Sequence, residues 1–128
     1  MIVKMKVLEI NNLVLAYLGD SVYETYIRFN LIKKGYNHVK NLQEKSLEYV
    51  SAKSQAKILK KLKDENTFNA EELEVIKRAR NTKINSHPKN CDIQTYHEAT
   101  SLEALFGYLK LQNNIERIEE IISKIFTD

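Results

Sequence analysis

Two acidic side chains in this chain have surroundings that suit chemistry, because each stands inside a helical pattern of apolar residues. The first is Asp20, in the stretch LAYLGDSVYE at residues 15–24. Spacings of three and four residues predict one buried stripe beside it, formed by Leu15, Leu18, Val22, Tyr26 and Phe29. A carboxylate in such surroundings loses hydration unless it is paired, hydrogen-bonded or bound to a cation. Gly19 adds a cost of about 1 kcal/mol relative to Ala in a helix interior. Two explanations stay open: close packing at Gly19 with Asp20 capping a backbone group, or a functional carboxylate.

The second acid is Glu103, in the stretch TSLEALFGY at residues 100–108. Gly107 follows it one turn later and lets another helix approach closely. Taken alone, Glu103 is typical of a solvated residue on a helix surface. Paired with Asp20, which also has a glycine nearby and apolar flanks, Glu103 becomes a candidate functional acid: if the two helices cross, the two acids face one another.

Two ionised carboxylates at close range repel each other, or one of them binds a proton. A divalent cation removes this repulsion by direct ligation. Mg²⁺ suits such a site because it keeps several waters and often takes only one or two carboxylates. Ser21 and Cys91 lack an assignable base, so a covalent route is not indicated. If the two acids meet, their pairing is therefore typical of a Mg²⁺ site.

The elements that position these acids are predicted to be helices, in an all-α fold with one domain over residues 1–128. Three glycines and one proline argue against a turn-dense β fold. The expected helices cover residues 11–34, 37–50, 51–62 (or from 54), 69–82, 95–112 and 115–125. Asn11 or Asn12 and then Asn69 are predicted N-caps, and Gly35 a helix stop. In the third helix the residues expected to face inward are Ala52, Ala56, Leu59 and Leu62. Residues 1–10 are expected to be a lead-in, and residues 83–94 a long irregular loop of the kind that is usually functional.

Composition is that of a globular protein outside the membrane. The chain has 128 residues, 43% hydrophobic and 29% charged, with a formal net charge of +3. The single cysteine excludes an internal disulfide, and with three scattered histidines it argues against a zinc site. Charges within residues 1–7 interrupt any signal-peptide core, and no apolar run approaches the ~20 residues of a membrane span. We therefore expect a cytoplasmic protein.

The two acidic stretches resemble the acidic motifs of ribonuclease III endonuclease domains. LGDSV at residues 18–22 is similar to the signature helix of these domains, and EALFG at residues 103–107 to their second acidic motif. The resemblance covers nearly the whole chain in order and extends to RARN at residues 78–81 and PKN at residues 88–90. With the short length, these features look most like Mini-ribonuclease III, a subfamily without the double-stranded-RNA-binding domain of full-length relatives.

The resemblance implies that Asp20 and Glu103 are the catalytic, metal-binding carboxylates. It implies a Mg²⁺-dependent endoribonuclease that hydrolyses phosphodiesters in double-stranded RNA and leaves 5′-phosphate and 3′-hydroxyl ends. Full-length relatives have further acids at the positions of Leu13, Ala16 and Thr100. The Mini subfamily shows similar losses, so these departures support the assignment. How a second metal ion would be held stays open.

Basic residues gather in two stretches that contain no acid. Residues 51–63 contain five lysines, a pattern typical of a solvated helix face. Residues 77–91 lead into the long loop before Glu103, and for them we favour RNA binding, since A-form RNA is recognised mainly through phosphates and 2′-hydroxyls. The predicted RNA-binding residues are Arg78, Arg80, Asn81, Lys83, Lys89 and Asn90.

The same resemblance implies a homodimer in which each copy contributes one active site to a shared RNA-binding surface. Aromatic residues of the first helix favour this, although a monomer core would use them equally well: Tyr17, Tyr23, Tyr26 and Phe29. The implied substrate is bacterial precursor 23S ribosomal RNA, with or without a ribosomal protein that presents it. Two other classes stay open: a non-catalytic RNA-binding or scaffold protein of the same fold, and a helical protein-interaction module.

Overall fold

The structure is a computed structural model that describes residues 9–127, and helices are the only regular elements of that part of the chain. The predicted all-α fold is confirmed. The helices are α1 (Asn12–Lys33), α2 (Val39–Val50), α3 (Ala52–Asp64), α4 (Ala70–Arg80), α5 (Ile93–Leu111) and α6 (Ile115–Ile125). None of the described helices is long and apolar enough to cross a membrane. The lead-in predicted for residues 1–10 lies outside the described residues except for its last two.

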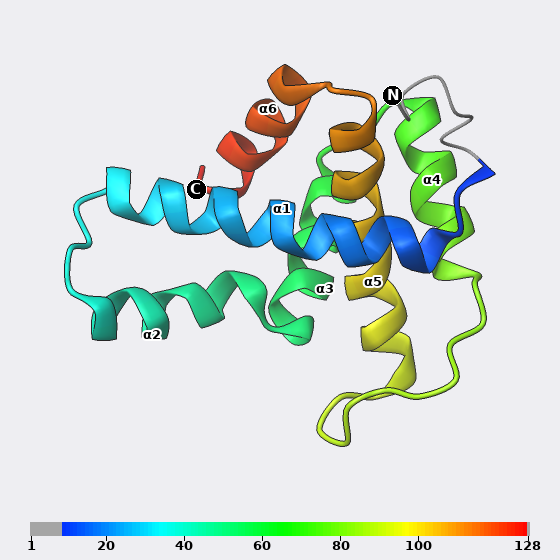
Figure 1. Cartoon of the computed structure of the whole chain (residues 1–128), viewed down its shortest axis with the longest axis horizontal. Coiled ribbons are helices and arrows are strands. Elements are labelled where there is room, and N and C mark those ends of the chain that lie inside the picture. The colour runs from blue at the N-terminus through cyan, green and yellow to red at the C-terminus, as the bar shows by residue number, and fades with distance from the viewer. Residues whose placement is uncertain (1–8, 128) are drawn as a thin grey trace.

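Helix α5 is the centre of the fold, and the other long helix, α1, crosses it (Figure 1). Helices α3 and α4 also pack against α5, and α2 returns along α1. Helix α6 follows α5 after a short turn and packs against α1, α3 and α5. The acid of the first motif therefore lies on one of the two crossing helices, and the acid of the second motif on the other.

Local signals in the sequence account for most helix ends. The Asn11 side chain accepts a hydrogen bond from Leu13 N at 2.7 Å and begins α1. Gly35, with φ of +107°, ends it in a conformation that L residues rarely adopt. Helix α3 begins after Ser51, not Ser54. Helix α5 begins two residues before the predicted start, because Asp92 accepts a hydrogen bond from Thr95 N at 2.8 Å.

The buried face of α1 differs from the predicted stripe. Phe29 is 55% exposed, and Leu18 and Tyr26 are only half-buried. The residues that face the core are Leu15, Ala16, Gly19, Val22, Tyr23, Ile27 and Leu31. Most of them stand at four-residue steps from Gly19. The crossing at Gly19 therefore fixes the rotation of α1 about its axis, which hydrophobic spacing alone left undetermined.

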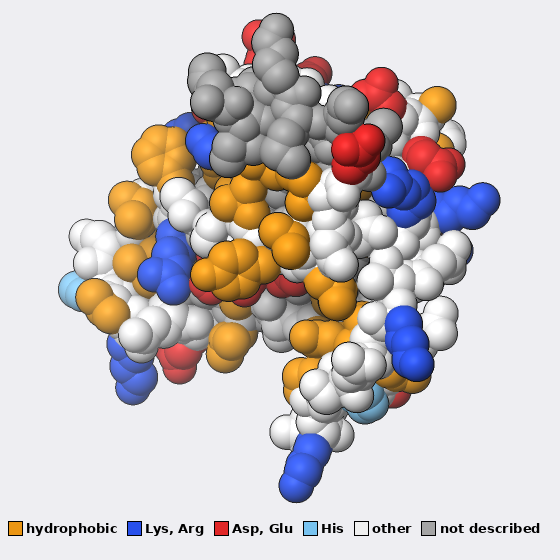
Figure 2. All heavy atoms as spheres, turned by 45° about the vertical axis from the view of Figure 1, so that its right-hand side comes forward, with side chains coloured by type: hydrophobic (Ala, Val, Ile, Leu, Met, Phe, Trp, Pro, Cys, Tyr) orange, Lys and Arg blue, Asp and Glu red, His pale blue; other side chains and the backbone are white. Residues whose placement is uncertain are grey.

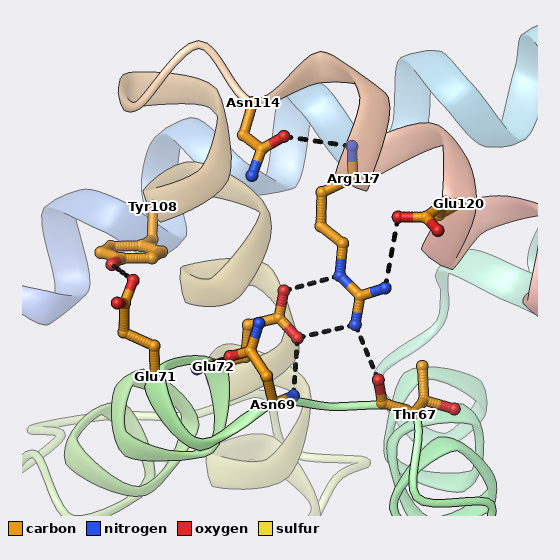
Figure 3. Close-up of polar contacts among 8 residues, drawn as sticks. All are labelled: Thr67, Asn69, Glu71, Glu72, Tyr108, Asn114, Arg117 and Glu120. Carbon is orange, nitrogen blue, oxygen red and sulfur yellow. Dashed lines mark hydrogen bonds and ion pairs between the residues drawn. The ribbon is translucent and has the colours of Figure 1, made fainter.

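An ion pair between Arg117 and Glu72 joins α6 to the start of α4 (Figure 3). The Arg117 guanidinium donates from Nε and Nη2 to the two Glu72 oxygens, at 2.7 and 2.8 Å, and from Nη2 to the Thr67 carbonyl at 2.7 Å. Glu72 also closes a capping box with Asn69, as the predicted N-cap requires. The Glu72 side chain is only 3% exposed, so this cluster is an internal brace of the fold.

Candidate active site

Two glycines let the backbones of α1 and α5 touch where the helices cross. A Cβ atom on Gly19 would overlap the carbonyl oxygen of Glu103, and one on Gly107 would overlap the carbonyl oxygen of Leu15. In both cases the obstacle is backbone, which cannot rotate away as a side chain can. The glycine of each acidic motif is therefore a steric requirement of the crossing.

The crossing places Asp20 and Glu103 on the wall of one cavity. It has a volume of about 430 Å³ and lies between α1, α5 and the loop that follows α4. The residues that line it are Leu13, Ala16, Tyr17, Asp20, Ile84, Asn85, Ser86, Tyr96, Thr100 and Glu103. None of these described lining residues is a lysine, arginine or histidine, so no basic side chain of the lining offsets the two carboxylates. The predicted convergence of the two acids is confirmed as geometry.

The two carboxyl groups differ in exposure and in the energy of ionisation. Asp20 is exposed, whereas Glu103 is half-buried. Burial and, next, the charge of Asp20 raise the pKa of Glu103 to about 8 from its usual 4.5. A hydrogen bond from Gln55 Nε2 to Glu103 Oε2, at 3.3 Å, acts in the opposite direction. A divalent cation between the acids would remove the repulsion that disfavours ionised Glu103. The oxygen donors present thus fit Mg²⁺.

Sequence reasoning missed Gln55. The inward face expected for α3 included Ala52 and Ala56, but both are only half-buried, and the buried residues are Gln55, Leu59 and Leu62. These three stand at the four- and three-residue steps of one helix face. Gln55 is the only polar residue in that row, a signal that the sequence did contain.

The loop over residues 81–92 reaches the cavity, but through residues other than those predicted to bind RNA. Ile84, Asn85 and Ser86 line the cavity. The four loop residues that were predicted to bind RNA are exposed: Asn81, Lys83, Lys89 and Asn90. Figure 2 shows basic side chains projecting at the lower right of the view, and acidic side chains recessed below hydrophobic ones near its centre.

The two arginines that were predicted to bind RNA make contacts within the protein. Arg80 pairs with Glu98 of α5, with Nη1 and Oε1 3.4 Å apart and 40% of the Arg80 side chain exposed. Arg78 is half-buried, and its carbonyl accepts hydrogen bonds from Asn12 and Thr82. These contacts fix the end of α4 against α1 and α5, at the point where the loop begins.

Comparisons with known proteins agree with this geometry. The family model of the ribonuclease III domain matches residues 13–114, which include both acidic motifs. The Mini-ribonuclease 3 of Staphylococcus aureus is 41% identical over 118 residues, which are 92% of this chain and 88% of that protein. The Mini-ribonuclease 3 of Brevibacillus brevis is 47% identical over 116 residues, 91% and 85% of the two chains.

A crystal structure of a Fusobacterium nucleatum protein is also similar, with a TM-score of 0.79 and 35% sequence identity. The match covers 91% of this chain and 93% of that one. The fold, with α1 and α5 crossing at the two acids, and the match to the family model define an endoribonuclease domain of the ribonuclease III class. Within that family, the chain belongs to the Mini-ribonuclease 3 group. The prediction of an endoribonuclease is therefore confirmed.

Proposed function

We propose that this endoribonuclease depends on Mg²⁺, hydrolyses phosphodiesters in double-stranded RNA, and uses Asp20 and Glu103 as its catalytic metal ligands. One observation carries the proposal. Two carboxylates 83 positions apart in the sequence line one cavity whose described lining contains no basic side chain. Such a pair is unfavourable in a protein that leaves it without a cation.

The chemistry needs both carboxyl groups in their ionised form. When bound, Mg²⁺ supplies a coordinated water of lowered pKa and offsets charge that develops on the phosphate. Asp20 is exposed and offers its carboxylate directly to the cavity. Glu103 must lose its proton to act as a ligand, and the Gln55 amide favours that ionised state. Attack by water on phosphorus with the 3′-oxygen as leaving group would break the P–O3′ bond, and the protonated 3′-oxygen and the phosphate would be the 3′-hydroxyl and 5′-phosphate ends that we expect.

The loop after α4 supplies the proposed RNA contacts. Lys83 and Lys89 are exposed on it, together with Asn81 and Asn90. The middle of the same loop forms part of the cavity wall, so phosphates bound along the loop would lie next to the acids. Lysine and asparagine side chains donate to phosphate and 2′-hydroxyl oxygens without reading bases. We therefore expect the shape of a duplex to select the site.

A homodimer is part of the proposal. Tyr17 lines the cavity and is 83% exposed, and Val14, one turn before it, is 54% exposed. An aromatic side chain this exposed next to a functional cavity is typical of an interface. Tyr23, by contrast, is fully buried and serves the core of its own chain. Maturation of 23S precursor RNA in the cytoplasm completes the proposal. No feature of the described residues points to a ribosomal protein, which we leave out of it.

Substitution of either acid tests the function. Asp20→Asn and Glu103→Gln should abolish cleavage of a labelled RNA duplex in Mg²⁺, while duplex binding in an electrophoretic shift assay is retained. Glu116→Gln, on the exposed face of α6, is the matched control and should cleave as the unaltered protein does. Full cleavage by either acid variant at saturating Mg²⁺, or undiminished cleavage in chelator, would refute the proposal.

A further inference from the structure

Gln55 is a buried polar residue for which the fold alone gives no reason. Gln55 is only 2% exposed, and the other two residues of this buried face of α3 are Leu59 and Leu62. A buried primary amide costs free energy unless its hydrogen bonds are made, and an apolar side chain of similar size would pack there without that cost. The amide therefore needs a partner, and its partner is Glu103.

The first turn of α3 holds Gln55 in place. Ser51 caps the helix by accepting from Ser54 N at 3.1 Å, and Gln55 N donates to the Ser51 carbonyl at 2.9 Å. Ser54 Oγ in turn donates to the Leu47 carbonyl of α2 at 3.2 Å. The side chain that reaches Glu103 thus comes from a capped turn tied to the preceding helix, not from a loop.

Gln55 contacts Glu103 from the interior of the protein and not from the cavity. Glu103 lines the cavity, whereas Gln55 is not among the lining residues. The Gln55 amide donates a hydrogen bond from Nε2 to Glu103 Oε2 at 3.3 Å. This hydrogen bond restrains the Glu103 carboxylate from the interior of the protein.

We propose that Gln55 is a positioning residue, which holds the Glu103 carboxylate in the orientation of a ligand for a divalent cation. The inference rests on the proposed function, because it requires Glu103 to bind the metal. Groups that orient metal ligands in this way typically contribute 10- to 100-fold in metal affinity or activity. Asn, with a side chain one methylene shorter, keeps the amide but does not reach Glu103.

Direct metal binding is the deciding measurement. Mn²⁺, which takes the same oxygen ligands as Mg²⁺, is titrated into the full-length protein and the free ion is followed by its paramagnetic resonance signal. Gln55→Met and Gln55→Asn should each weaken Mn²⁺ binding about 10- to 100-fold. The Mg²⁺ concentration for half-maximal cleavage should rise by a similar factor, with the rate at saturating Mg²⁺ largely recovered.

A control on the same helix face separates positioning from packing. Leu59→Met alters the fully buried residue one turn along α3 and should leave Mn²⁺ affinity unchanged. Thermal unfolding of each variant establishes that it is folded at the assay temperature. Unchanged Mn²⁺ affinity in both Gln55 variants would overturn the inference, as would an equal loss in Leu59→Met.

The two proposals fail differently. If Glu103→Gln loses Mn²⁺ binding and the Gln55 variants keep it, the metal site stands and the positioning role does not. If Glu103→Gln binds Mn²⁺ as the unaltered protein does, the proposed function fails, and the role of Gln55 fails with it.

Discussion

Replacing Gly19 by alanine should separate the two helices that carry the acids. In an open helix this substitution would stabilise the protein by about 1 kcal/mol, because alanine has the higher helix propensity. Here the added Cβ overlaps the carbonyl oxygen of Glu103 and lies 2.8 Å from Gly107 N. The neighbouring atoms are backbone, so α1 and α5 must move apart.

The magnitude follows from two opposing terms. Overpacking a well-packed core costs typically 1–3 kcal/mol, and a backbone obstacle places Gly19→Ala at the upper end, about 3 kcal/mol. Subtracting the propensity gain of about 1 kcal/mol leaves a net loss of about 2 kcal/mol in the free energy of unfolding. For a domain of this size, the melting temperature should fall by roughly 8 °C.

Activity should fall further than stability. A displacement of about 1 Å at a catalytic centre can cost on the order of 100-fold in rate, and separating the helices displaces Glu103 from Asp20. Thermal unfolding by circular dichroism and duplex cleavage well below the melting temperature measure the two effects. Ser21→Ala, an exposed position two residues along α1, should change neither by much. A Gly19→Ala protein more stable than the unaltered one would refute the backbone contact.

Titration, ion-pair and salt-dependence experiments test three other features. Because burial and a neighbouring carboxylate raise the pKa of Glu103 to about 8, the metal-free folded state retains a proton that the unfolded state loses above its ordinary pKa. Stability in urea should therefore fall as pH rises from about 4.5 to about 8, and Glu103→Gln should remove that dependence. Arg117→Met leaves buried Glu72 without its guanidinium, so we expect a loss of about 3–5 kcal/mol in the free energy of unfolding, partly recovered by adding Glu72→Gln. Replacing Lys83 and Lys89 by glutamine should weaken duplex binding and lower its salt slope by about one per lost phosphate contact.

Matched variants control the ion-pair and salt-dependence experiments. Arg28 pairs with Glu24 on the surface of α1, with 69% of its side chain exposed, so Arg28→Met should cost at most about 0.5 kcal/mol. An equal cost for Arg28→Met and Arg117→Met would contradict the bracing role of the buried pair. Lys124→Gln on α6 removes one positive charge away from the loop and should leave the salt slope unchanged. If the variants with Lys83 and Lys89 replaced have the same salt slope as the unaltered protein, phosphate contacts by the loop are excluded.

The sequence was sufficient to predict the helices and the meeting of the two acids. Capping residues and glycine stops are local signals, and Asn11, Gly35 and Asn69 act in the structure as predicted. The pairing of Asp20 with Glu103 followed from two acids with a nearby glycine in apolar patterns. Its catalytic and metal-binding role stays a prediction, as does the extension of the domain over the whole chain.

The sequence did not predict how each helix is rotated about its own axis, because that rotation depends on long-range contacts. Phe29 was assigned to the core of α1 by spacing, yet the contact of Gly19 with α5 turns it outward. The partner of Gln55 depends on a long-range contact in the same way, because Glu103 lies 48 residues away on another helix. The Arg117–Glu72 pair was likewise invisible, since nothing local relates residues 45 positions apart.

The contact of α1 with α5 through main-chain atoms makes the spacing of the acids independent of side-chain choice over most of the interior. Peptide groups are common to every residue, so a repacked interior under α6 or α4 would leave this spacing unaltered as long as both glycines are kept. Engineers who want a more heat-resistant nuclease therefore have many interior positions to vary and two, Gly19 and Gly107, to leave alone.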